Sequence, residues 1–424
     1  MSVEIKNNAP NGIEDITIVV EAFDGTEIDI TENVSSFSIF ENILSPFLYG
    51  YISVIDNSAM LSSLPWLGQE KITFRWLRND EFVDKVFYST GIENVIPNNT
   101  PSAQYKIHIT TEKQFLNSVN LISKAYTART DQIIQTIYGE VFDADLVLNA
   151  VGNQTYNVVL PYLKPFQIID LLLKNSLADD QTPMFLFDRF YEQENSTILT
   201  SYAQMFAQDP IVELSPKKSV NRITQQNEPN ESYQVYVYNV IKAFNTLKQM
   251  SAGAYSSTQR TYDISNKSNA IDQNFYFKDL APNLGREWIK DQFEFDKLSS
   301  RRVNKLQDSL SFENGLPNLY DVDDLDSMIH KSYMNRLQTI VIDASINPIA
   351  YTIEDNEAFT VGKTVDFSVP VFMPITPSMK NEDVKNKPLS GKYLITSIRH
   401  QMSGREYTMS IELSRDYLGE ETII

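Results

Sequence analysis

The sequence predicts an α+β protein that is mainly β. Three observations support this class: strand patterns fill residues 13–112, the hydrophobic period becomes helical from about residue 116, and strand patterns return from residue 340. At 424 residues the chain is long enough for about three domains. With 42% hydrophobic and 21% charged residues, it is expected to form packed domains rather than to stay disordered.

Composition and charge exclude several classes of function. The formal net charge is −19 and adjacent basic residues occur only as isolated pairs, so binding to nucleic acid through phosphate contacts is not expected. The chain has no cysteine, which removes disulfides, thiolate catalysis and thiolate-bound zinc. The N-terminal residues lack the basic and apolar parts of a signal peptide, and no apolar stretch approaches the roughly 20 residues that span a bilayer, so no membrane anchor is expected.

Residues 13–112 are predicted to form a closed barrel or a sandwich. Residues 16–23 and 26–30 alternate on either side of Asp24-Gly25, a two-residue hairpin turn. Closing such a sheet would remove the exposed edges that recruit other chains. Further candidate strands lie at residues 36–40, 48–55, 71–77, 85–89 and 104–110.

Helices and strands are mixed between residues 116 and 206, which predicts a small α/β domain. Thr130 can cap a helix that continues with apolar residues at helical spacing. Pro165 suits the first turn of a second helix. Two strands, 183–188 and 197–202, then bracket a polar turn.

The following segment is expected to contain loops and an insertion. Residues 207–230 are polar and contain three prolines, and a strand follows at 233–238. Residues 264–319 have weak periodicity and one expected short helix at 284–293. The four aspartates of 321–326 open a last helix, and they fit a helix N-terminus better than a calcium loop because the central glycine and the glutamate at the twelfth position are absent.

The C-terminal strands end in a long hairpin. Gly362-Lys363 is expected to form a tight turn, and residues 391–415 are expected to pair around Ser403-Gly404 as a two-residue turn. This turn would place Ile398 opposite Met409, with one face of the hairpin largely apolar and the other mostly polar. The shorter strands before the hairpin are at residues 339–343, 358–361 and 364–369.

No catalytic, cofactor or metal site is predicted. His108, His330 and His400 lie far apart in the sequence, and none has the spacing of a pair of metal ligands. There is no phosphate-binding loop, nucleophile elbow or dinucleotide fingerprint. Paired carboxylates for glycoside hydrolysis cannot be assigned among 55 acidic residues. We therefore expect no enzyme activity and no cofactor.

The closing segment, GKYLITSIRH at residues 391–400 followed by Tyr407, Ile411 and Leu413, resembles the last strands of the baseplate central hub proteins of contractile-tail bacteriophages. That family is related to the hub part of type VI secretion spike proteins. Other segments resemble the family's passages in the same order along the chain, at residues 47–56, 184–201, 242–263 and 359–370.

The resemblance implies two similar antiparallel β-barrels with a small α/β domain between them and an insertion in the second barrel. The expected parts are the first barrel at 1–115, the α/β domain at 116–206, the split second barrel at 207–263 and 338–424, and the insertion at 264–337.

The resemblance also implies a structural role in the tail baseplate of the virion, after assembly in the host cytoplasm. Three copies would form a ring with pseudo-sixfold symmetry that joins the trimeric spike to the hexameric tail tube. Its channel would pass the tape measure protein and then DNA, without specific binding, and baseplate wedge proteins are further expected partners. The alternatives are the hub of a related contractile injection system, a tail-associated cell-wall-degrading or carbohydrate-binding protein, and another virion β protein such as a distal tail ring component.

Overall fold

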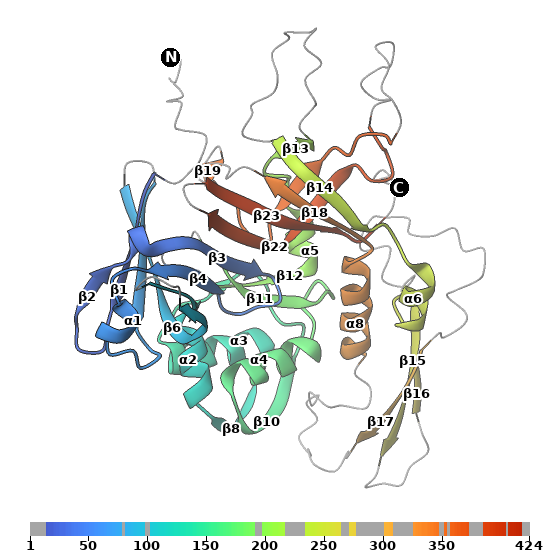
Figure 1. Cartoon of the computed structure of the whole chain (residues 1–424). Helices are drawn as coiled ribbons and strands as arrows, with labels where there is room; N and C mark the ends of the chain where they lie inside the picture. Colours follow the sequence, from blue (N-terminus) through green and yellow to red (C-terminus); the bar gives the residue numbers. More distant parts are fainter. Residues whose placement is uncertain are drawn as a thin grey trace, which may run out of the picture.

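The computed structural model is mainly β, as the sequence predicts (Figure 1). The structure describes residues 14–78, 81–97, 102–190, 197–216, 234–263, 271–276, 301–307, 325–346, 352–353, 357–372, 385–403 and 406–417. None of the helices in these segments is long and apolar enough to cross a membrane.

One sheet of thirteen strands runs through the described part of the chain, in the order β2-β1-β5-β6-β7-β4-β3-β22-β21-β13-β14-β18-β23. Figure 1 shows its first half in blue and its second half mainly in orange and red. Its strands are β1 (Glu14–Glu21), β2 (Glu27–Asp29), β3 (Val34–Asn42), β4 (Tyr49–Asp56), β5 (Lys71–Arg78), β6 (Glu81–Pro97), β7 (Ala103–Thr110), β13 (Glu213–Pro216), β14 (Gln234–Lys242), β18 (Ile340–Ile346), β21 (Thr364–Phe367), β22 (Gly391–Ser403) and β23 (Glu406–Arg415).

The second half of this sheet is a closed barrel. β22 pairs with β23 as well as with β21, so the six strands β22-β21-β13-β14-β18-β23 return to their starting point. The strand that completes the circle, β13, pairs in parallel with both β21 and β14, whereas the other neighbours in the barrel are antiparallel. Closure satisfies backbone groups that an open sheet would leave at its edges.

The first half of the sheet has seven strands, and the described strand pairs do not close it. β2 ends the sheet, and a 3₁₀ turn, η1 (Thr31–Asn33), connects it to β3. The turn is fixed to the sheet because the amide of Ile30 donates to the Ile18 carbonyl at 2.9 Å and the Asn33 side chain donates to the Ile55 carbonyl at 3.2 Å. The expected first barrel is therefore a curled, open sheet in its described strand pairs.

The two halves join through β3 and β22. These strands pair antiparallel from Ser36 with Ser403 to Asn42 with Ser397. Buried side chains from both halves form one hydrophobic cluster that continues across the junction. The alternation of apolar and polar residues in the sequence thus buries one continuous core rather than two separate ones.

The C-terminal hairpin forms, but the predicted register is wrong. Ile398 lies opposite Ile411 rather than Met409, a difference of two residues. Because side chains alternate between faces, a shift of two keeps the predicted apolar face, and all three residues are buried. A bulge after Ile395 interrupts the alternation, and Ile395 is buried as well. Gly404, the second residue of the predicted turn, lies outside the described residues.

Residues 112–207 mix helices with small sheets and have a hydrophobic core of their own. Pro165 begins a helix, as the sequence predicts. Thr130 is the first helical residue of α3 and not its cap; the preceding Arg129 holds the capping position, and its amide donates to the Gln132 side chain at 3.3 Å. The elements are α2 (Glu112–Val119), β8 (Ile122–Arg129), α3 (Thr130–Ile137), the π-helical turn η2 (Tyr138–Phe142), β9 (Val147–Leu148), β10 (Thr155–Leu163), α4 (Pro165–Lys174), β11 (Met184–Asp188), β12 (Thr197–Ser201) and α5 (Tyr202–Ala207).

A further sheet of three strands extends from the body of the molecule at the lower right of Figure 1. β15 pairs antiparallel with β16 and in parallel with β17, so this sheet begins before residue 264. The expected helix at 284–293 and the aspartates at 321–324 lie outside the described residues. The elements here are α6 (Thr246–Ser251), β15 (Ser256–Asp263), β16 (Ile271–Tyr276), β17 (Arg302–Gln307) and α8 (Asp326–Leu337), and the short elements elsewhere are α1 (Met60–Ser63), β19 (Thr352–Ile353) and β20 (Glu357–Ala358).

Candidate functional site

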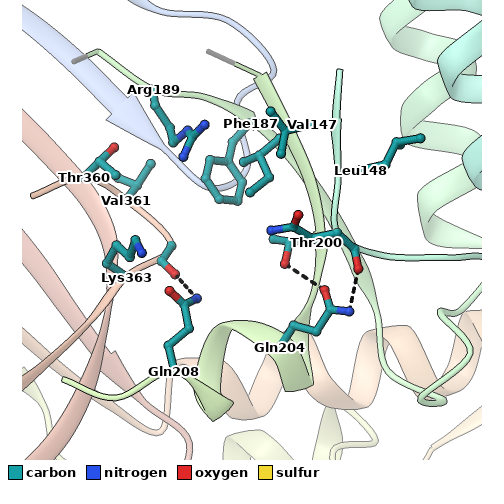
Figure 2. Close-up of a pocket in the computed structure, with 13 residues that line it drawn as sticks. Val147, Leu148, Phe187, Arg189, Thr200, Gln204, Gln208, Thr360, Val361 and Lys363 are labelled. Carbon is teal, nitrogen blue, oxygen red and sulfur yellow. Dashed lines mark hydrogen bonds between the residues drawn. The ribbon is translucent and has the colours of Figure 1, made fainter. Parts of the chain in front are cut away.

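A pocket of about 550 Å³ lies between the barrel and the sheet formed by β11, β12 and β9 (Figure 2). One wall comes from β9, β11 and β12, the floor from α5 and the residue that follows it, and the opposite wall from residues 360–363 ahead of β21. The pocket therefore collects side chains that are far apart in the sequence.

Two glutamines connect the walls of the pocket. The Gln204 side chain donates to the Asn149 carbonyl at 2.6 Å and accepts from the Thr200 hydroxyl at 3.2 Å. Gln208 donates to the carbonyl of Gly362 at 3.1 Å (Figure 2). These bonds tie α5 to β9 and β12 on one side and to the barrel on the other.

The charged residues that line the pocket are basic. Arg189 and Lys363 lie on the side of the pocket that also carries Thr360 and Val361 (Figure 2). Among its described lining residues there is no carboxylate and no imidazole, so this part of the pocket offers no general base. The arrangement can hold a polar or anionic group, and its described side chains do not form a nucleophile–base pair.

Gly362 allows the barrel to approach this sheet closely. Its φ is +80°, a conformation that favours glycine, and the sequence predicts a tight turn here. A Cβ added at this position would lie 2.5 Å from Cζ of Phe187, a pocket residue on β11. The turn prediction is confirmed, and the structure adds the reason that a side chain does not fit.

A buried polar network lies beside the pocket, at the β3–β22 junction. His400 places Nε2 2.7 Å from Oε1 of Glu41 and Nδ1 2.6 Å from the Tyr407 hydroxyl. The Thr360 hydroxyl donates to the other carboxyl oxygen of Glu41 at 2.7 Å. His400 and Glu41 are completely buried, so no solute reaches them in this conformation. Their role here is to satisfy one another across the junction.

The other two histidines lie elsewhere and in different environments. His108, on β7, is 3.1 Å from Glu93 in an exposed pair. His330, on α8, is half-buried, and burial, assisted by the positive charge of Lys174, lowers its pKa to about 4. Among the described residues, no group of three or more histidine, aspartate or glutamate side chains is arranged to hold a metal ion.

No pattern in the sequence predicts the pocket or the buried network. Glu41 and His400 are 359 residues apart, so no local pattern connects them. One signal was present: His400 occupies a position on the apolar face of its strand, in step with Ile398 and Met402. A polar side chain at such a position needs a buried partner.

Comparison with solved structures identifies proteins that share the fold of this chain. No protein-family model matches the chain, and no match is found among curated proteins. A solved tail protein from Neisseria meningitidis MC58 is similar with a TM-score of 0.57 at 10% identity, over 95% of this chain and 97% of that one. The 43 kDa tail protein of prophage MuSo2 from Shewanella oneidensis is similar with a TM-score of 0.54 at 12% identity, over 95% of this chain and 100% of that one.

The similarity extends over nearly the whole of all three chains. At 10–12% identity it establishes a shared fold and not a shared activity. The chain therefore has the fold of these tail proteins.

Proposed function

We propose that the protein is the structural baseplate hub of a contractile phage tail. In this role three copies form a ring with pseudo-sixfold symmetry, which joins the trimeric spike to the hexameric tail tube and encloses the channel for the tape measure protein and DNA. The observation that carries the proposal is the fold shared with two tail proteins over at least 95% of each chain.

The continuous thirteen-strand sheet supports a ring. One chain contributes a curled seven-strand half and a closed barrel half, joined side by side through β3 and β22. Three such chains would present six sheet halves, which suits contact with a sixfold tube on one side and a threefold spike on the other.

The charge of the chain supports the passage of DNA without binding. A formal net charge of −19 repels phosphate, and salt screens part of this repulsion. Replacing acidic residues that face the channel by lysine should slow DNA ejection, and unchanged ejection kinetics would argue against this part of the proposal.

The proposed role includes no catalysis. An assay of cell-wall hydrolysis with the purified protein tests this directly, and clear activity would favour the tail-associated hydrolase instead.

The native mass of the purified protein, alone and mixed with a candidate spike protein, tests the hub. We expect about three times 48.5 kDa, either unaided or once the spike is added. The matched control is a mixture with an unrelated trimeric protein, which should leave the mass unchanged. A chain that stays monomeric and binds neither spike nor tube would contradict the proposal.

A further inference from the structure

The two halves of the large sheet contain the same five-strand unit. In the first half, five strands lie side by side in the order β5-β6-β7-β4-β3. In the second half, five strands lie side by side in the order β21-β22-β23-β18-β14. The strands also follow each other along the chain in the same order, β3 to β7 in one unit and β14, β18, β21, β22 and β23 in the other. The unit is thus repeated in space and in sequence, with β14 in the place of β3 and β22 in the place of β6.

Matching irregularities align β6 with β22. The pairing of β6 with β7 shifts between Ser89 and Gly91, and that of β22 with β23 shifts between Ile395 and Ser397. In both strands the second pair after the shift joins two isoleucines, Ile92 with Ile107 and Ile398 with Ile411. Bulges are specific features of a strand, so a bulge at the same place in both units fixes the alignment.

A second pair of bulges aligns β3 with β14. The pairing of β3 with β4 shifts between Val34 and Ser36, and that of β14 with β18 shifts between Val235 and Val237. Position 36 of the first unit therefore corresponds to position 237 of the second.

Within one chain the two units use these strands to join. The outer edge of β3 pairs with β22 over Ser36–Asn42 and Ser397–Ser403. As a result β3 is covered on both sides, and Phe37 and Ile39 are only 2% and 0% exposed.

The equivalent edges, on β14 of the second unit and on the second half of β6 of the first unit, have no such partner in the described part of the structure. β13 reaches only the first two residues of β14, Gln234 and Val235, and the remainder pairs only with β18 among the described strands. On this edge strand Val237 and Ile241 are 67% and 55% exposed.

The corresponding part of β6 is open in the same way. β5 pairs with β6 only as far as Tyr88, and beyond it β7 is the one described neighbour. Val95 and Ile96 in this stretch are 49% and 56% exposed. Open edges with apolar side chains recruit further strands, and soluble proteins usually protect them with charges or by pairing.

We propose that β14 of one copy pairs antiparallel with the second half of β6 of another copy, in the manner in which β3 pairs with β22 inside each chain. The partner is a second copy of this chain because the contact continues a junction that each chain already contains. The contact is head-to-tail, so successive copies close into a ring when the rotation permits. The inference rests on the proposed homotrimer and names the strands that hold it together.

The internal junction also predicts the register between copies. Ser38 pairs with Gln401 and Phe40 with Arg399 at that junction. Each strand has one further shift, between Glu93 and Ile96 in β6 and between Val240 and Lys242 in β14. Counted through these shifts, the pairs place Asn239 opposite Ile96 and Lys242 opposite Glu93 of the next copy.

Cross-linking through introduced cysteines tests the pairing, because the natural chain has none. Two single variants, Asn239→Cys and Ile96→Cys, are mixed and treated with an oxidant or a short bismaleimide. We expect a covalent pair of chains in the mixture and much less in either variant alone. The double variant should give a ladder of products that ends at three linked chains. The matched control mixes Asn239→Cys with Val159→Cys, a residue of similar exposure, 52%, on β10, and should give no specific product.

The native mass of the same samples separates this inference from the hub itself. A trimer in which the mixture cross-links no more than the control overturns the β14–β6 pairing and leaves the hub standing. A chain that remains monomeric with and without the spike overturns both. A trimer with the expected cross-link supports both.

Discussion

Both halves of the large sheet contain the same five-strand unit, and they differ in the strand that is added to it. In the first half β1 runs antiparallel to β5, carries β2 on its other side and leaves the sheet open. In the second half the four residues of β13 run parallel to β21 and β14 and close the barrel. The same five-strand unit therefore stays open in the first half and is closed into a barrel by β13 in the second half. β13 lies outside the repeated unit.

Equivalent positions also differ in burial. Phe37 and Ile39 of β3, which pairs with β22, are buried, while Tyr238 and Val240, their counterparts on β14, are half-buried. The difference shows that burial at these positions comes from the neighbouring unit and not from the strand itself. It also suggests ways to disturb one copy of the unit while sparing the other.

The largest effect is expected from lysines on the open edge. Val237→Lys combined with Ile241→Lys should weaken association of the copies by about 100-fold or more, because burying each apolar side chain contributes roughly 1.5–3 kcal/mol and edge lysines oppose strand pairing. Native mass over a concentration series measures this, and circular dichroism confirms that the monomer stays folded. Val159→Lys with Val151→Lys is the control away from this edge, and equal weakening there would contradict the assignment.

Next in size is the loss of the buried pair at the closed junction. Glu41→Gln should destabilise the chain by about 1–3 kcal/mol, because it removes the charge and puts an NH2 group where either His400 or Thr360 meets an acceptor oxygen. Glu93→Gln, in the exposed pair with His108 on the open edge, should cost less than about 1 kcal/mol. Urea unfolding of both variants gives the comparison. Similar losses would mean that the two junctions do not differ as the burial indicates.

The next prediction compares the cost of replacing one glycine in each half of the sheet, at a turn that precedes a strand. Gly362 precedes β21 and Gly68 precedes β5, and their φ values are +80° and +85°. Alanine is strained by such angles at both sites, but only Gly362 also lacks space, since no atom lies within 4 Å of a Cβ at Gly68. Gly362→Ala should therefore cost about 1–3 kcal/mol more than Gly68→Ala in unfolding measurements. Equal costs would show that Phe187 moves aside freely.

The smallest predicted effect concerns α8. This helix lies in the segment that connects β14 to β18, whereas the equivalent strands of the first half, β3 and β4, are connected by residues 43–48 alone. His330 on α8 has its pKa lowered from 6.5 to about 4, mainly by burial. A lowered histidine pKa favours the neutral form in the folded state, so its stabilisation is complete above pH 6.5 and is lost as the pH falls towards 4. Urea midpoints at pH 7 and pH 4.5 should differ less in His330→Gln than in the natural chain. An unchanged pH difference would contradict the prediction.

Local patterns in the sequence were sufficient for many single elements. Strand alternation placed the hairpin at 391–415 and its apolar face, and Pro165 marked the start of a helix. The turn at Gly362 was readable because it separates two strand patterns. The repeat was not visible as a sequence repeat, since equivalent positions such as Phe37 and Tyr238, or Ser38 and Asn239, share a place in the sheet rather than a residue type.

The sequence by itself determined which residues alternate, where helices begin and which face of a strand is apolar, because these follow from neighbouring side chains and backbone propensities. Only the tertiary structure decided the hairpin register, the closure of one barrel by the parallel strand β13, and the contact of Glu41 with His400. These features depend on bulges and on pairings between distant segments. Their free energy comes from contacts that form only after long loops have closed, and no local pattern encodes that outcome.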